Sequence, residues 1–187
     1  MSSLKLIHET SPYAARNIIQ TRRFIVSDIL SDSGLNVKII NHPKGNAWAR
    51  QAKYTGAELV FEWTGPVSTE LSEHGYEPGI LYDHYSHRGF IPVGTMSHLY
   101  LVDVHLKGDV SWHTVLQKPQ FKLFRPDGWL AWVQSKHPRW LDQAVLEFQD
   151  EIENIVKNRE PFKIVFPDIC GYESTLRRRF PNIPKEL

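Results

Sequence analysis

One short run of this sequence gathers most of the kinds of side chain that can take part in chemistry. It contains Tyr82, Asp83, His84, Tyr85, His87 and Arg88. Its acid and imidazole groups are candidates for acid–base roles, because histidine titrates near neutral pH. Its arginine carries a planar, permanently charged group that can stabilise phosphate or developing charge. Its tyrosines can either stack on a flat ligand ring or pack in the core.

A second polar group, His8-Glu9-Thr10-Ser11, stands near the N-terminus. Taken alone, it needs no ligand. His8 would be a polar residue that ends a strand, and Ser11 would be the N-cap of the helix that follows.

Metal sites and the common nucleotide sites are not expected. A metal would have to use His84, His87, His105 and His113, but no carboxylate stands at a fixed spacing from them. The sequence has no glycine-rich phosphate loop, no Gly-x-Ser-x-Gly elbow and no Cys/His nucleophile pair. The commonest nucleotide-binding and hydrolase routes are therefore excluded.

Composition and charge indicate one compact domain without a global electrostatic field. The 187 residues are 41% hydrophobic, and 22 Lys and Arg against 21 Asp and Glu give a charge of +1. A nucleic-acid partner would need a local patch, such as Lys118–Arg125 or Arg177–Arg179, although solvated surface is the preferred interpretation of both. The single cysteine, Cys170, and the absence of a signal or membrane span favour a cytoplasmic protein.

The elements that position these groups follow from residue patterns. Ser11 and Pro12 mark a helix start, and Ala15, Ile18 and Ile19 form its apolar face. Helices are predicted over Pro12–Arg23, Gly45–Tyr54 and Pro138–Lys157. Strands are predicted over Leu4–Ile7, Val37–Ile40, Leu59–Trp63, Phe90–Gly94, Leu99–Leu106 and Phe162–Phe166.

Other stretches give weaker signals. Alternation in Leu99–Leu106 sets Leu99, Leu101 and Asp103 on one face of that strand, against Tyr100, Val102 and Val104 on the other. The stretch Thr64–Gly79 is predicted to be a long loop, and the region Trp112–Lys136 is predicted to be irregular.

The first strand, the turn from His8 to Ser11 and the first helix together resemble the opening of the ADP-ribosyltransferase fold. The next strand, helix and strand resemble the NAD-cradling core of that superfamily. The resemblance implies that His8 bonds the ribose of NAD and that Thr10 supports binding of the nicotinamide half. It also implies that Tyr82 or Tyr85 stacks on the nicotinamide ring.

The run Arg88-Gly-Phe-Ile-Pro-Val-Gly-Thr95 is similar to the strand that carries the catalytic glutamate in arginine-directed toxins of the superfamily. Here the matching position holds Arg88. Transferases that modify DNA bases use an arginine together with a glutamate, and RNA 2′-phosphotransferases use arginine and histidine. The resemblance therefore implies that Arg88 stabilises charge in the reaction, or else that activity has been lost.

A competing alignment takes Gly79-Ile-Leu-Tyr82 as the family's Gly-x-Tyr strand, with Leu99–Gly108 as the strand that follows it. Glu160, just before the last strand, is then the catalytic acid. This alignment requires an insertion after the first helix.

The resemblance implies an α+β fold with a split antiparallel sheet and flanking helices, in a single domain over 1–187. Residues 1–108 would form the NAD-binding core, and 109–187 an extension packed on it. The implied enzyme cleaves nicotinamide from NAD and transfers ADP-ribose to a protein or nucleic acid, as toxins and defence proteins of the superfamily do. The alternatives are a non-catalytic module that binds RNA or protein, and an enzyme similar to RNA 2′-phosphotransferases.

Overall fold

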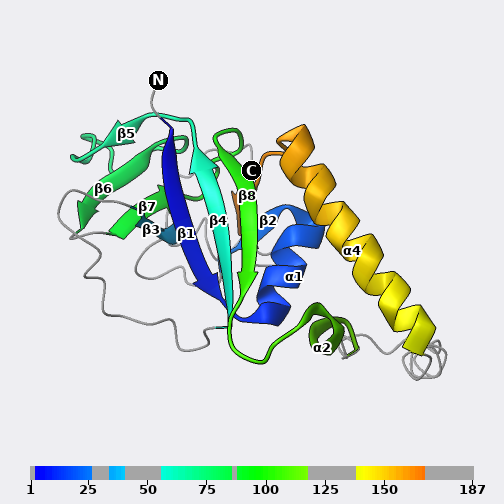
Figure 1. Cartoon of the computed structure of the whole chain (residues 1–187). Coiled ribbons are helices and arrows are strands. Elements are labelled where there is room, and N and C mark those ends of the chain that lie inside the picture. Colours follow the sequence, from blue (N-terminus) through cyan, green and yellow to red (C-terminus); the bar gives the residue numbers. More distant parts are fainter. Residues whose placement is uncertain (1–2, 27–33, 41–55, 86–87, 118–137, 167–187) are drawn as a thin grey trace, which may run out of the picture.

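The computed structural model describes residues 3–26, 34–40, 56–85, 88–117 and 138–166. It shows an α+β fold in which α1 and α4 lie on the same side of a curled, mostly antiparallel sheet (Figure 1). The predicted class is therefore confirmed. The helices are α1 (Pro12–Thr21), α2 (Trp112–Gln117) and α4 (Pro138–Asn158). The strands are β1 (Leu4–Thr10), β2 (Arg23–Ile25), β3 (Gly34–Ile39), β4 (Ala57–Trp63), β5 (Val67–Ser68), β6 (Leu81–Tyr85), β7 (Arg88–Pro92), β8 (Leu99–Leu106) and β9 (Lys163–Val165).

The junction of β1 and α1 forms as the sequence predicts. The Ser11 hydroxyl accepts a hydrogen bond from the Ala14 backbone N–H at 3.2 Å, and Pro12 occupies the first turn. The helix buries Ala15, Ile18 and Ile19. It ends at Thr21, two residues before the predicted end, because Arg22 adopts a left-handed conformation with φ of 55°.

The seven-stranded sheet has the order β5-β6-β7-β3-β1-β4-β8. The pairing between β1 and β3, called here the seam, is short. β1 pairs with β4 over seven residue pairs, from Leu4 to Thr10. It pairs with β3 over only two, Leu6 with Ile39 and Ile7 with Lys38. Beyond Ile7 the two strands separate, so the sheet is split at the end where His8 lies.

A β-bulge between β4 and β8 changes which side chains of β8 face the core. The register shifts so that Phe61 of β4 opposes Leu101, while Val60 opposes Asp103. Val102 is therefore the extra residue, and the inward positions change from odd to even numbers. Val104 and Leu106 pack against the core, whereas Asp103 is exposed, so the simple alternation expected for this strand is wrong after Leu101.

The core is shared between the first hundred residues and the C-terminal segment. Phe24 of β2 packs against Phe61 and Phe162, with ring centroids 5.5 and 6.2 Å apart. β2 and β9 form a separate two-stranded parallel sheet. Phe148 and Ile155 of α4 belong to the same buried cluster. The extension therefore completes one hydrophobic core.

Five predictions concern residues outside these elements or between them. The predicted helix Gly45–Tyr54 lies outside the described residues, as do Lys118–Arg125 and Arg177–Arg179. The predicted loop before Gly79 contains the short strand β5, and the region after Trp112 begins with α2. In the part of the chain that is described, no helix is both long and apolar enough to cross a membrane.

Candidate functional site

His8 lies at the split between β1 and β3. Its Nδ1 is 3.1 Å from the backbone carbonyl oxygen of Asn36, and its ring meets Phe24 edge to face at 5.2 Å. A carbonyl oxygen only accepts hydrogen bonds, so Nδ1 carries the hydrogen. In the neutral imidazole, Nε2 is then the nitrogen that accepts.

Burial lowers the pKa of His8 from its ordinary value of 6.5, and the Asn36 carbonyl and Glu9 oppose that shift only partly. The cost of placing a charged ring among apolar side chains is the dominant effect. His8 is therefore held neutral at pH 7.

The lowered pKa predicts a pH-dependent stability. The unfolded chain takes up the His8 proton near pH 6.5, whereas the folded protein takes it up only at lower pH. The contribution of the neutral His8 ring to the free energy of unfolding is therefore fully present above about pH 6.5. It is lost as the pH falls toward the pKa of His8 in the folded protein. An NMR titration of the His8 ring should give a midpoint below 6.5.

Comparison with His8→Phe isolates this contribution, because the variant keeps a ring but cannot be protonated. Its free energy of unfolding should change less than that of the wild type between pH 7 and pH 5. A His8 midpoint at or above 6.5 would contradict the prediction.

Arg88 begins β7 and reaches the same asparagine. Its Nε donates a hydrogen bond to Oδ1 of Asn36, and its backbone is paired with Lys38 of β3. His8 and Arg88, which are 80 positions apart in the sequence, therefore both bond to Asn36. Sequence reasoning missed Asn36, whose only signal is that it alternates with apolar residues in β3, as Lys38 also does.

Thr10 is the last residue of β1, opposite Ala57 of β4. Side chains two positions apart on a strand share a face, so Thr10 lies on the His8 side. The sequence-predicted pair therefore stands on one strand end, beside the split.

The two tyrosines lie in β6, two strands from β3. Tyr82 is 1% exposed, its ring meets that of Tyr76 at 5.0 Å, and its hydroxyl accepts a hydrogen bond from the Glu77 backbone N–H at 2.9 Å. A ligand would reach this ring only if Tyr76 moved. The backbone of Tyr85 is paired with Arg88, and its side chain lies outside the described part of the structure.

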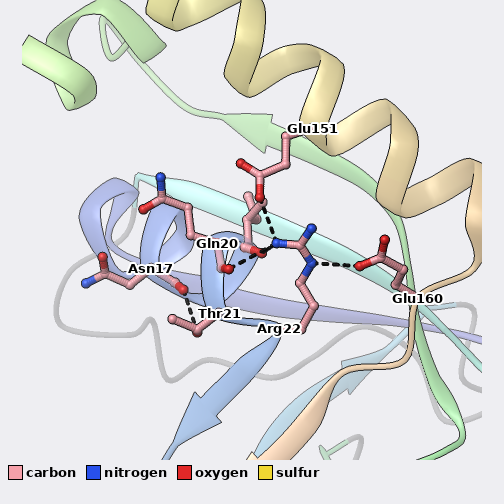
Figure 2. Close-up of polar contacts among 7 residues, drawn as sticks. Asn17, Gln20, Thr21, Arg22, Glu151 and Glu160 are labelled. Carbon is pink, nitrogen blue, oxygen red and sulfur yellow. Dashed lines mark hydrogen bonds and ion pairs between the residues drawn. The ribbon is translucent and has the colours of Figure 1, made fainter.

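Glu160 lies beside Arg22 at the opposite end of α1 from His8. Figure 2 shows the Arg22 guanidinium between two carboxylates, with Nε 2.9 Å from Glu160 and Nη1 2.7 Å from Glu151 of α4. Arg22 also donates to the backbone carbonyls of Ile19 and Gln20, which close α1. These contacts give Glu160 a structural role as the partner of Arg22.

A second polar cluster, also missed from sequence, lies next to His8 on β1. Glu9 is directly opposite Glu58 of β4, and the Lys107 ammonium contacts both carboxylates. The hydrogen bond to Glu58 is the main cause that raises the pKa of Lys107, with smaller contributions from Glu9. Since neighbouring residues on a strand point to opposite faces, this cluster and His8 lie on different sides of β1.

Two other histidines form surface pairs with aspartates. His105 is 3.4 Å from Asp103, and His113 is 3.0 Å from Asp142. Within the described ranges, no group of three or more His, Cys, Asp or Glu residues is placed to hold a metal ion.

With this geometry in view, the chain was compared with known proteins. No family model, no curated protein and no solved structure matches it.

Proposed function

We propose that this protein is an NAD-dependent ADP-ribosyltransferase whose NAD site is the split between β1 and β3. The observation that supports the proposal best is His8 at the end of the pairing between β1 and β3, where its Nδ1 donates to the Asn36 carbonyl and Nε2 is left as the accepting nitrogen of a neutral ring. The resemblance singled out His8 as a ribose ligand and Arg88 at the usual glutamate position. Arg88 bonds the side chain of Asn36, which lies on the other face of β3 from His8.

Each group has a chemical role that suits NAD. The accepting Nε2 of a neutral His8 takes a hydrogen bond from a ribose hydroxyl, and Thr10 supports the nicotinamide half. The Arg88 guanidinium suits anionic groups, such as the diphosphate of NAD, because it is permanently charged and planar. Holding both halves of NAD in place lowers the entropy cost of reaching the transition state.

In the proposed reaction the bond between nicotinamide and C1′ of the ribose breaks, and its electron pair leaves with the nicotinamide. A nucleophile of the macromolecular acceptor, a protein or a nucleic acid, then bonds to C1′ and releases its proton to water. Toxins and defence proteins of the superfamily carry out this chemistry on both kinds of acceptor.

The direct test is to incubate the protein with NAD and follow nicotinamide release by chromatography. Acceptors are surveyed with NAD labelled in the adenosine part, using single- and double-stranded DNA, RNA and a protein mixture. NAD should also raise the melting temperature, since a ligand that binds only the folded state stabilises it. The proposal fails if no nicotinamide is released with any acceptor and NAD leaves the melting temperature unchanged.

Replacing Glu160 decides between the two alignments of the sequence. Because Glu160 is bonded to Arg22, Glu160→Gln should lower the melting temperature by a few degrees while nicotinamide release per folded molecule stays within about twofold. Glu151→Gln is the matched control, since it removes the other carboxylate of the same arginine.

The opposite pattern would support the competing alignment. If Glu160→Gln lost roughly 100-fold in kcat while Glu151→Gln did not, and the two melting temperatures agreed, Glu160 would be the catalytic acid.

A further inference from the structure

We infer that the face of the sheet opposite α1 and α4 (Figure 1) is a docking surface for single-stranded nucleic acid. Its charged contacts come from four cations on neighbouring strands and at the edge of the sheet, called here the basic band: Lys5, Lys38, Arg88 and Arg159. The inference goes beyond the proposed function and does not depend on it, because His8, beside the seam, lies on the other face of β1 from Lys5. The two basic patches noted in the sequence are not part of this surface.

The strand registers place three of these cations next to one another. Lys38 of β3 is directly opposite Arg88 of β7. Ile7 of β1 is opposite Lys38, so Lys5, two residues earlier on the same face, is the diagonal neighbour of Lys38. Like charges that stand directly opposite each other in a sheet are destabilising. An anion that contacts both Lys38 and Arg88 removes that repulsion, so the pair favours an anionic partner.

The fourth cation reaches this face at the edge of the sheet. The segment after α4 pairs with the edge strand β8 through Tyr100 and Pro161. Arg159 lies with its guanidinium 4.8 Å from the centroid of the Tyr100 ring, and its Nη2 is 2.8 Å from a carboxylate oxygen of Glu62. Glu62 is also opposite Lys5. This carboxylate offsets one of the four positive charges, so the band together with Glu62 has a net charge of +3.

Both arginines of the basic band are oriented by neighbours within the protein. Nε of Arg88 donates to Oδ1 of Asn36, and Arg159 is held by Glu62. A guanidinium that is already restrained loses less conformational entropy when it binds a phosphate. The Arg88 guanidinium suits the phosphate of a nucleic acid as well as that of NAD, and on this face it adjoins the other cations of the band.

Two tyrosines flank the basic band. Tyr100 lies beside Arg159 at one end. At the other end, the ring of Tyr76 packs on Phe90, which shares its face of β7 with Arg88. Both tyrosines are half-buried, whereas Phe90 is 1% exposed. The bases of a single strand can stack on such rings, while those of a duplex are already stacked on each other. The combination of cations and partly exposed rings therefore favours a single strand over a duplex or an anionic membrane.

Fluorescence anisotropy with labelled oligo-dT and oligo-U of about 12 nucleotides tests the inference on the full chain. Each phosphate that is neutralised on a single strand adds about 0.7 to the slope of log Kd against log salt concentration, so four cations predict a slope of about 3. The double variant Lys5→Ala, Lys38→Ala should reduce the slope to about 1.5 and raise Kd roughly 10-fold or more.

Lys157→Ala is the control for these substitutions. It removes an exposed lysine of α4, which lies on the helix side of the sheet, and should leave Kd within about twofold. The variants should unfold within a few degrees of the wild type, because each substitution removes a charged side chain without opening the core. Circular dichroism during heating measures this, so a loss of binding cannot be confused with a loss of folding.

The inference is overturned if the wild type binds neither oligonucleotide, or if the double variant binds them as the wild type does. Equal affinity for a duplex of the same length would contradict the preference for a single strand. Binding to vesicles of phosphatidylcholine and phosphatidylserine, with no binding to the oligonucleotides, would assign the surface to a membrane instead. None of these measurements uses NAD, so their outcome is separate from that of the nicotinamide assay.

Discussion

Arg22→Ala should lower the melting temperature by roughly 6–12 °C, which corresponds to about 3 kcal/mol for a chain of this size. The Arg22 side chain is 24% exposed and bonds two carboxylates and two helix-end carbonyls. Hydrogen bonds that involve a charged group contribute more than neutral ones, and those to Arg22 are partly shielded from water. Thermal unfolding followed by circular dichroism measures the effect.

Arg159→Ala is the matched control for this prediction. Arg159 also follows a helix in a left-handed conformation, with φ of 51°, and also pairs with a carboxylate, that of Glu62. Its side chain is 55% exposed, however, so its removal should cost about 1 kcal/mol or less. Equal destabilisation by the two substitutions would show that the contacts of Arg22 with α4 and Glu160 add nothing to an ordinary surface pair.

His8→Phe should reduce nicotinamide release by roughly 100-fold or more and abolish the NAD-dependent rise in melting temperature. The variant keeps an aromatic ring next to Phe24 but removes both ring nitrogens. In the proposed complex the ribose hydroxyl then loses its acceptor, and the Asn36 carbonyl loses its donor. Chromatographic assay of nicotinamide and a thermal-shift titration with NAD measure the two effects.

His105→Phe makes the same chemical change on β8, where the histidine side chain is 53% exposed and pairs only weakly with Asp103. It should leave both readouts within about twofold. Wild-type rates in His8→Phe would remove His8 from the site and leave the split in the sheet without a role in NAD binding.

Local signals in the sequence predicted most of the large elements. Ser11, Pro12 and the buried face of Ala15, Ile18 and Ile19 define α1, and the 3.6-residue pattern from Pro138 defines α4 to within one residue. Shorter elements were missed because their partners are far away in the chain. β2 has three residues, of which Ile25 is 61% exposed, and it is a strand only because β9 lies beside it.

The candidate site shows the same contrast between residues with local sequence signals and residues whose partners are far away in the chain. His8 and Arg88 were proposed as site residues because each stands close to a predicted strand and the resemblance supports it. The contacts of Asn36 with His8 and Arg88 could not be predicted, because they depend on how β3 pairs with β1 and β7, which no local pattern encodes. The role of Glu160 was likewise hidden, because Arg22 lies 138 positions earlier and carries no glycine signal at the helix end.

The 138 positions between Arg22 and Glu160 also determine how long Arg22 waits for its partner while the chain is being synthesised. Arg22 and β2 leave the ribosome well before Glu160 and β9, by roughly 10–30 s at ordinary elongation rates. During that interval β1, β3 and β4 can already pair, but the arginine at the end of α1 has no carboxylate to meet, and Phe24 lacks Phe162 as a neighbour. Part of the hydrophobic core of the nascent chain therefore stays incomplete until the C-terminal segment has been made.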